Sequence, residues 1–192
     1  MKTTTKKLIL LASGGGSNVE NIIKYFKNKP NIKVVLVAGN NKNAYVFERV
    51  KPFNIETLVF DKSYFNDKFV NIIERYNPDL IVLAGFLWKI PELWINKYPK
   101  KIINIHPSLL PSFGGKGMYG ANVHKAVINS KVKKTGISVH LVNEEYDEGN
   151  IIFQAETNVL SEDTPESIAR KVQILEKEHF PRVIKEYLFK IE

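Results

Sequence analysis

Short apolar runs alternate with amphipathic segments along the first half of this chain. Runs such as Val34-Val35-Leu36-Val37-Ala38 and Leu80-Ile81-Val82-Leu83-Ala84 contain no polar position, so a strand formed by either must be covered on both faces. That pattern is typical of a parallel sheet whose strands are joined by helical crossovers. We therefore predict strands over Lys7–Ala12, Lys33–Gly39, Glu56–Phe60, Leu80–Ala84 and Ile102–His106.

The segments between these strands space their apolar residues as helices do. We predict helices over Val19–Lys27, Ala44–Lys51, Tyr64–Tyr76 and Pro91–Lys97. Strands and helices that alternate in this way indicate an α/β protein with a doubly wound, mostly parallel sheet.

The pattern changes after Pro111. A glycine-rich loop leads to a short predicted helix, Asn122–Asn129, and then to two predicted strands, Thr135–Leu141 and Ile151–Val159. The polar connection between these strands is short, which favours an antiparallel pair at the C-terminal side of the sheet.

The last predicted helix begins at Thr164-Pro165, where a helix N-cap precedes a proline at the first helical position. We expect Pro181 to kink or break this helix, because proline lacks the N–H group of the helical hydrogen bond. The whole pattern predicts one domain, residues 1–192.

Length and composition are those of a soluble globular protein. A chain of 192 residues with 44% hydrophobic residues and a mean hydropathy of −0.19 can bury roughly 70% of its unfolded surface. No apolar run approaches the roughly 20 residues of a membrane span, and the stretch Leu8 to Ala12 is too short for the core of a signal peptide. The chain has no cysteine, which fits a cytoplasmic protein and excludes disulfides and thiolate metal sites.

The charge is basic, with 28 Lys and Arg against 20 Asp and Glu and a net charge of +8. Such a balance suits nucleic acid or anionic small molecules. The basic residues are scattered, and no aromatic and basic platform for stacking bases stands out. A nucleic-acid-binding module is therefore the weaker interpretation, and we expect small-molecule partners.

A glycine-rich segment, Ser13-Gly14-Gly15-Gly16-Ser17-Asn18, follows the first strand and opens the first helix. Glycines let backbone N–H groups approach a ligand closely, and a helix N-terminus favours anions. A dinucleotide fingerprint is excluded because Val19 replaces the third glycine and no carboxylate ends the second strand. An ordinary flexible turn and a site for one phosphate, held by Gly16, Ser17 and Asn18, remain open.

Asn104 and His106 lie two positions apart at the end of a predicted strand, so their side chains share one face. Pro107 cannot donate to the sheet and ends the strand. The carboxyl end of a strand is where open α/β sheets bind ligands. Amide and imidazole groups can both donate to a developing oxyanion, and imidazole exchanges protons near neutral pH. A lone core histidine is the alternative.

Asp147 lies in the polar connection Tyr146-Asp147-Glu148-Gly149. A carboxylate there is usually a turn residue, and it becomes catalytic only if the fold brings it to His106. The other histidines show no metal-ligand spacing, so we expect no metal. His124, on a predicted helix, and His140, on a predicted strand, are assigned structural roles.

These segments together resemble the folate-dependent formyltransferases. The shared features are the Asn-x-His pair at Asn104 and His106, the segment Ser108-Leu109-Leu110-Pro111 and the later Asp147. Further matches are the glycine-rich segment, Leu83-Ala84-Gly85-Phe86 and Thr135-Gly136-Ile137-Ser138-Val139-His140. The similarity covers nearly the whole chain and implies a Rossmann-like formyltransferase fold, with phosphate binding in the N-terminal half and folate binding and catalysis in the C-terminal half.

The members most similar to this chain formylate the terminal amine of glycinamide ribonucleotide, with 10-formyltetrahydrofolate as the donor, in purine biosynthesis. The resemblance implies that Asn104, His106 and Asp147 are catalytic and that Asp147 keeps His106 charged. It implies that the phosphate binds Gly16, Ser17 and Asn18, and that Gln173 and Glu176 face the substrate, Glu176 at the ribose. The residues implied at the folate are Leu87, Trp88, Lys89, Ile90, Asn104, Asn143, Glu144, Glu145, Tyr146 and Asp147.

Two segments depart from the family pattern. The family commonly has Met-Arg-Ile after Ala-Gly-Phe, whereas this chain has Leu87-Trp88-Lys89-Ile90. Lys89 and Lys62 are therefore both candidates for the carboxylate of the folate tail. The loop from Phe113 to Gly120 is also richer in glycine than in many relatives.

Two rivals within the family are formyltetrahydrofolate hydrolase and a transferase for another amine. We expect neither the N-terminal domain of the hydrolases nor the C-terminal domain of the transferases that act on methionyl-tRNA, because the first predicted strand begins at Lys7 and the chain ends soon after the last helix. A monomer or weak homodimer is expected.

Overall fold

Seven strands form a single sheet in the computed structural model, which describes residues 5–191. The strands are β1 (Lys6–Ala12), β2 (Ile32–Gly39), β3 (Thr57–Val59), β4 (Leu80–Leu83), β5 (Ile102–His106), β6 (Lys134–Leu141) and β7 (Ile151–Asn158). Their order is β3-β2-β1-β4-β5-β6-β7, with parallel pairing from β3 to β5 and antiparallel pairing of β6 with β5 and β7. The predicted fold class is confirmed.

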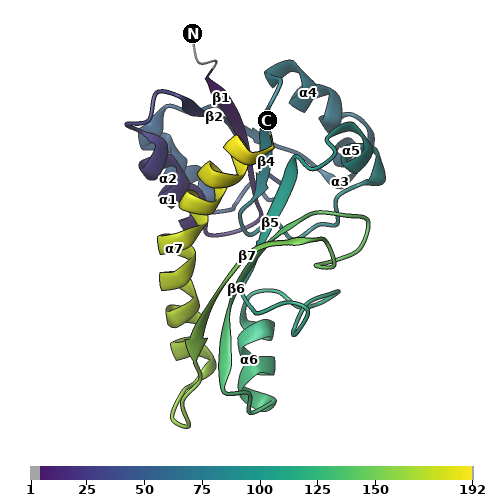
Figure 1. The fold of residues 1–192 in the computed structure, drawn as a ribbon. Coiled ribbons are helices and arrows are strands. Elements are labelled where there is room, and N and C mark those ends of the chain that lie inside the picture. The colour runs from purple at the N-terminus through teal and green to yellow at the C-terminus, as the bar shows by residue number, and fades with distance from the viewer. Residues whose placement is uncertain (1–4, 192) are drawn as a thin grey trace.

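The helices join and cover these strands (Figure 1). They are α1 (Ser17–Phe26), α2 (Val46–Val50), α3 (Lys62–Asp67), α4 (Phe69–Tyr76), α5 (Glu92–Lys97), α6 (Ala121–Asn129) and α7 (Pro165–Lys190), with a 3-10 turn, η1, over Lys51–Phe53. The single helix predicted over Tyr64–Tyr76 is wrong, because the chain forms two helices with a break at Lys68. None of the helices in the described part of the chain is long and apolar enough to cross a membrane.

α7 runs through Pro181 without a break, so of the expected kink or break the break does not occur. Figure 1 shows its last turns, in yellow, inclined to the rest of the helix. Proline has no N–H for the carbonyl of Lys177, four residues earlier. The side-chain amide of Asn21, on α1, donates to that carbonyl at 2.9 Å. A neighbouring helix thus supplies the hydrogen bond that the proline removes. At the other end, Thr164 caps the helix as predicted.

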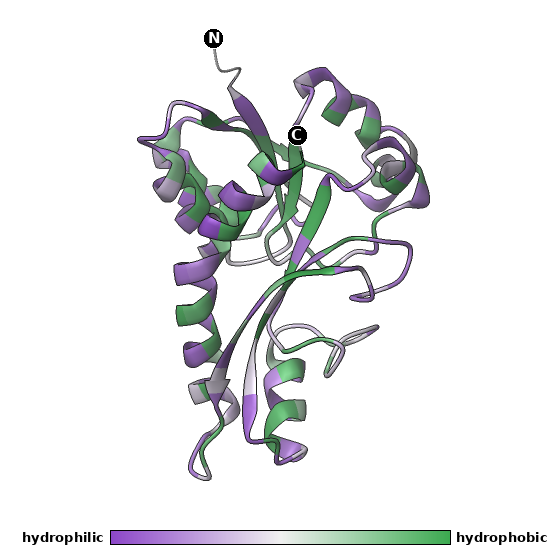
Figure 2. Cartoon of the chain, in the orientation of Figure 1, coloured by the Kyte–Doolittle hydropathy of each residue, from purple (hydrophilic) through white to green (hydrophobic). Residues whose placement is uncertain are grey.

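Two apolar cores lie on opposite faces of the sheet. Along β1, Leu8 and Leu10 join the core formed with α1, α2 and α7, whereas Ile9 and Leu11 join the core formed with α3, α4 and α5. Alternate residues of one strand therefore enter different cores. This explains why the buried runs of β1 and β4 carry no polar position, and Figure 2 shows β4 as hydrophobic.

The fold also determines where a ligand site can form. β2 lies on one side of β1 and β4 lies on the other, so the connections after β1 and β4 leave the sheet in opposite directions. Such a switch point opens a crevice at the carboxyl ends of the strands. The glycine-rich segment after β1 and the Asn104–His106 pair at the end of β5 both reach this edge.

Candidate active site

The glycine-rich segment forms a tight entry into α1. Gly16 is the N-cap of this helix and has φ 73°, a backbone conformation that favours glycine. A Cβ at Gly16 would lie 2.5 Å from Cγ2 of Val46, so α2 leaves no room for a side chain. No side chain among residues 5–191 caps α1. The N–H groups of its first turn, at Ser17 and Asn18, are therefore suited to an anion.

Glu176 reaches the same region from α7. Its Oε2 accepts a hydrogen bond from Nδ2 of Asn18 at 3.0 Å. Burial raises the pKa of Glu176 above its ordinary value, although Asn18 and Lys177 oppose the change. Gln173 lies one turn earlier on α7 and is exposed to the cavity. The structure thus brings the predicted phosphate and ribose residues together.

Asn104 lies opposite His140 in the antiparallel pairing of β5 with β6. Nδ1 of His140 is 2.7 Å from the carbonyl oxygen of Leu141 and must donate to it, which leaves Nε2 as the acceptor in the neutral ring. Nδ2 of Asn104 donates to this Nε2 at 3.1 Å and to Oδ1 of Asp147 at 3.4 Å. Both N–H groups of the Asn104 amide therefore have an acceptor, and the longer contact, with Asp147, is the weaker hydrogen bond.

His106 lies between a carboxylate and a backbone carbonyl. Its Nδ1 is 3.4 Å from Oδ2 of Asp147, and its Nε2 is 2.8 Å from the carbonyl oxygen of Phe113. The approach of Asp147 to His106, on which the catalytic interpretation depends, is present. Burial lowers the pKa of His106, although Asp147 and Phe113 raise it. The net direction is downward because His106 is only 3% exposed, and it opposes the expectation that Asp147 keeps this ring charged.

Asp147 takes part in most of these contacts. The backbone N–H of Gly115 donates to its Oδ2 at 3.0 Å, and Nε2 of His140 is 3.5 Å from its Oδ1. Burial raises the pKa of Asp147, but His140, His106 and Gly115 outweigh burial, so the pKa lies below the ordinary value. The site therefore holds a carboxylate beside the buried imidazole of His106.

One cavity of about 660 Å³ connects these groups. The predicted site residues that line it are Gly16, Ser17, Asn18, Leu87, Trp88, Lys89, Ile90, Asn104, His106, Asn143, Glu145, Tyr146, Asp147, Gln173 and Glu176. Lys62 and Glu144 do not line this cavity. They line an adjoining cavity of about 580 Å³, which shares Trp88 and Lys89 with the first.

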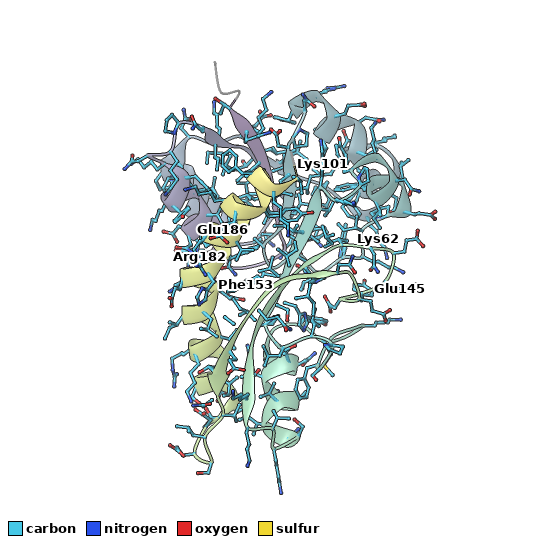
Figure 3. All side chains as sticks on the ribbon, in the orientation of Figure 1. Lys62, Lys101, Glu145, Phe153, Arg182 and Glu186 are labelled. Atoms are coloured by element: carbon cyan, nitrogen blue, oxygen red, sulfur yellow. The ribbon has the colours of Figure 1, made fainter. Side chains whose placement is uncertain are left out.

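Side chains of opposite charge lie at the boundary between the two cavities. Nζ of Lys89 lies 3.5 Å from Oε2 of Glu145. Lys62 on α3 and Glu145 on the β6–β7 connection lie at the same side of the molecule (Figure 3). Trp88 packs against Phe60 and Phe65, so its ring forms part of the wall. Lysines therefore supply the cations here in place of the arginine of the family pattern.

Sequence reasoning missed two histidines at this site. His140 contacts Asn104 and Asp147, and His124 on α6 lines the main cavity. Burial, and the nearby His106, lower the pKa of His124, and its Nδ1 is buried with no hydrogen-bond partner in the described part of the chain. The register of β5 with β6 would have identified His140, but it depends on the folded sheet. Within residues 5–191, no group of three or more His, Asp or Glu side chains is placed to hold a metal ion.

The fold and the site define a class of protein: an α/β protein with an Asn-His-Asp cluster and a glycine-capped helix N-terminus at the switch point of its sheet. The formyl transferase family model matches residues 6–184. The chain belongs to the formyl transferase family.

Similar proteins within this family are phosphoribosylglycinamide formyltransferases. The Bacillus subtilis protein of that name is 36% identical over 95% of this chain and 95% of its own length. The chloroplastic protein of Arabidopsis thaliana is 41% identical over 91% of this chain, which spans 62% of that relative. A solved structure of the Anaplasma phagocytophilum enzyme superposes with a TM-score of 0.88 at 33% identity, covering 97% of this chain and 89% of the other.

Proposed function

We propose that this protein transfers the formyl group of 10-formyltetrahydrofolate to the terminal amine of glycinamide ribonucleotide. The products are formylglycinamide ribonucleotide and tetrahydrofolate, and the reaction belongs to de novo purine biosynthesis. One observation carries the proposal: the cluster of Asn104, His106 and Asp147 opens into the same cavity as the anion site at Gly16. A substrate with an amine at one end and a phosphate at the other fits that arrangement.

The reaction begins when the amine attacks the formyl carbon. A C–N bond forms, and the carbonyl oxygen of the formyl group becomes an oxyanion. Asn104 is placed to donate to this oxyanion once its 3.4 Å contact with Asp147 is exchanged for the ligand. One such donor is typically worth about 3–4 kcal/mol of transition-state stabilisation.

His106 and Asp147 then carry the proton. The attacking nitrogen loses one proton, and the folate nitrogen gains one when its bond to carbon breaks, so none is consumed. Nδ1 of the neutral His106 can take up this proton, because Nε2 is already occupied by the Phe113 carbonyl. Asp147, 3.4 Å away, stabilises the imidazolium that forms.

The remaining residues bind the two substrates. Gly16, Ser17 and Asn18 hold the phosphate, and Gln173 and Glu176 face the ribonucleotide. The segments 87–90 and 143–147 line the pteridine site, with Lys62 and Lys89 for the anionic folate tail. We place the enzyme in the cytoplasm, as a monomer or weak homodimer that gel filtration with light scattering would distinguish.

A folate assay tests the proposal. Purified protein is mixed with a 10-formyl folate with and without glycinamide ribonucleotide, and deformylation is followed spectroscopically. We expect turnover only with the ribonucleotide, and much weaker turnover with glycinamide, which lacks the ribose phosphate. Turnover without any amine would indicate a hydrolase, and no turnover in any mixture would refute the enzyme assignment.

A further inference from the structure

Two serine side chains are completely buried behind His106. Ser108 follows β5, and Ser138 lies on β6 opposite His106 in the strand pairing. Both are 0% exposed. A buried hydroxyl is costly unless it is hydrogen-bonded, so the partners of these two groups indicate their purpose.

Ser138 uses its full hydrogen-bonding capacity. Its Oγ donates to the carbonyl of Ser108 at 2.7 Å. It accepts from the backbone N–H of Leu110 at 2.8 Å and from Nε2 of Gln154 at 2.8 Å. A hydroxyl has one proton and two lone pairs, so all three positions are occupied. Gln154 also donates to the carbonyl of Leu110 at 3.0 Å. The β6–β7 ladder thus holds the Ser108–Leu110 segment at three points.

Ser108 extends the same network toward the site. Its Oγ donates to the carbonyl of Ser112 at 2.6 Å. The next residue, Phe113, has φ 58°, and its carbonyl lies 2.8 Å from Nε2 of His106. The turn held by the two serines therefore ends on the carbonyl that contacts the imidazole.

A carbonyl oxygen can only accept, so this contact requires the proton of His106 to be on Nε2. We propose that Ser138 and Ser108 are positioning residues that fix the tautomer of His106 through the Phe113 carbonyl. Nδ1 is thereby left as the nitrogen that exchanges a proton, on the side of Asp147. The charged and titratable groups that face the ring, namely Asp147, His140 and His124, come from other segments and do not provide this acceptor.

The kinetic importance of the tautomer rests on the proposed function, whereas its existence does not. Two measurements therefore accompany each variant. Nitrogen-15 NMR of the imidazole nitrogens reports which nitrogen of His106 carries the proton, without any substrate. Steady-state kinetics with both substrates separates kcat from KM.

The variants are Ser138→Ala and Ser108→Ala, and the control is Thr135→Val on the same strand. Thr135 is 1% exposed, and its Oγ1 has no hydrogen-bond partner among the described residues, so the control removes a buried hydroxyl outside the network. We expect wild type and Thr135→Val to show the Nε2–H tautomer. We expect each serine variant to show a mixture of tautomers and a kcat lower by roughly ten-fold or more, with KM little changed.

A pure Nε2–H tautomer in both serine variants would overturn the proposal, and so would an unchanged kcat in an active enzyme. If Ser138→Ala does not fold, Ser108→Ala decides, since it leaves the fully bonded Ser138 in place. If the wild type has no formyl transfer activity, the proposed function fails, and the NMR comparison still tests the tautomer.

Discussion

At the scale of single residues, the site is defined by hydrogen bonds that are already made. His140 and Asp147 direct both amide protons of Asn104, and Phe113 holds one nitrogen of His106. In the proposed reaction, the reactive atoms are those left over: Nδ1 of His106 and the weakly bound amide proton of Asn104. Changes to these groups should therefore affect the chemical step directly.

Removing His106 or neutralising Asp147 should stop chemistry more than binding. In the His106→Ala and Asp147→Asn variants we expect kcat to fall at least about 100-fold, while substrate affinities measured by calorimetry change little. Glu148→Gln makes the same carboxylate-to-amide change on a neighbouring residue outside the cluster and should keep wild-type kcat. A wild-type kcat in Asp147→Asn would remove Asp147 from the mechanism.

Gly16→Ala should disrupt the proposed phosphate site. The new Cβ would lie 2.5 Å from Val46 at a φ of 73°, so the loop must move away from α2. We expect KM for the ribonucleotide to rise at least about ten-fold and the free energy of unfolding to fall by about 1–3 kcal/mol. Gly15→Ala is the matched control, because nothing lies within 4 Å of a Cβ there. Equal effects in the two variants would contradict this account of Gly16.

At the scale of elements, the local sequence pattern correctly predicts a helix or strand where its own residues mark its ends. The predicted bounds of β5 and the Thr164 cap of α7 are confirmed. The exceptions are places where distant residues decide. Pro181 has the local character of a helix break, yet α1 provides the missing hydrogen bond through Asn21. The break at Lys68 between α3 and α4 has no such explanation in its contacts.

A double-mutant cycle should detect the bond between α1 and α7. Asn21→Ala removes the side-chain donor to the carbonyl of Lys177. Pro181→Ala restores a backbone N–H at position 181, which can donate to the same carbonyl. We expect Asn21→Ala to cost about 0.5–1 kcal/mol more in the wild-type protein than in the Pro181→Ala variant, as measured by urea denaturation. Helix propensity and cavity effects cancel in the cycle. A coupling of zero would mean that water replaces Asn21 at no cost.

At the scale of the whole molecule, burial of the site has a consequence for stability. Burial lowers the pKa of both His106 and His124 below the ordinary value of 6.5. As the pH falls through 6.5, the unfolded chain binds protons that the native protein does not, so stability decreases. Glu176 acts in the opposite sense, because its pKa is raised above 4.5 and its native form retains a proton that the unfolded chain has lost.

The Glu176→Gln variant lacks the opposing carboxyl group. In this variant we therefore expect the free energy of unfolding to fall as the pH is lowered from about 7.5 to 5.5. Each histidine contributes a slope of at most about 1.4 kcal/mol per pH unit. Urea titrations at these pH values measure the slope, which should be smaller when His124→Gln is added. A flat profile would show that neither imidazole is held neutral by the fold.

The sequence by itself determined the α/β class, most elements, the glycine-rich loop at the start of the first helix and the Asn104–His106 pair. These features follow from local spacing: two residues on one strand face stay together in any fold that keeps the strand. The tertiary structure alone decided that Asp147 reaches His106, that His140 joins Asn104 and that Lys62 lies in a second cavity. It also decided that the pKa of His106 is lowered, because burial depends on every segment packed around the ring. Strand register and the approach of distant loops are properties of the whole packed chain, and no local pattern encodes them.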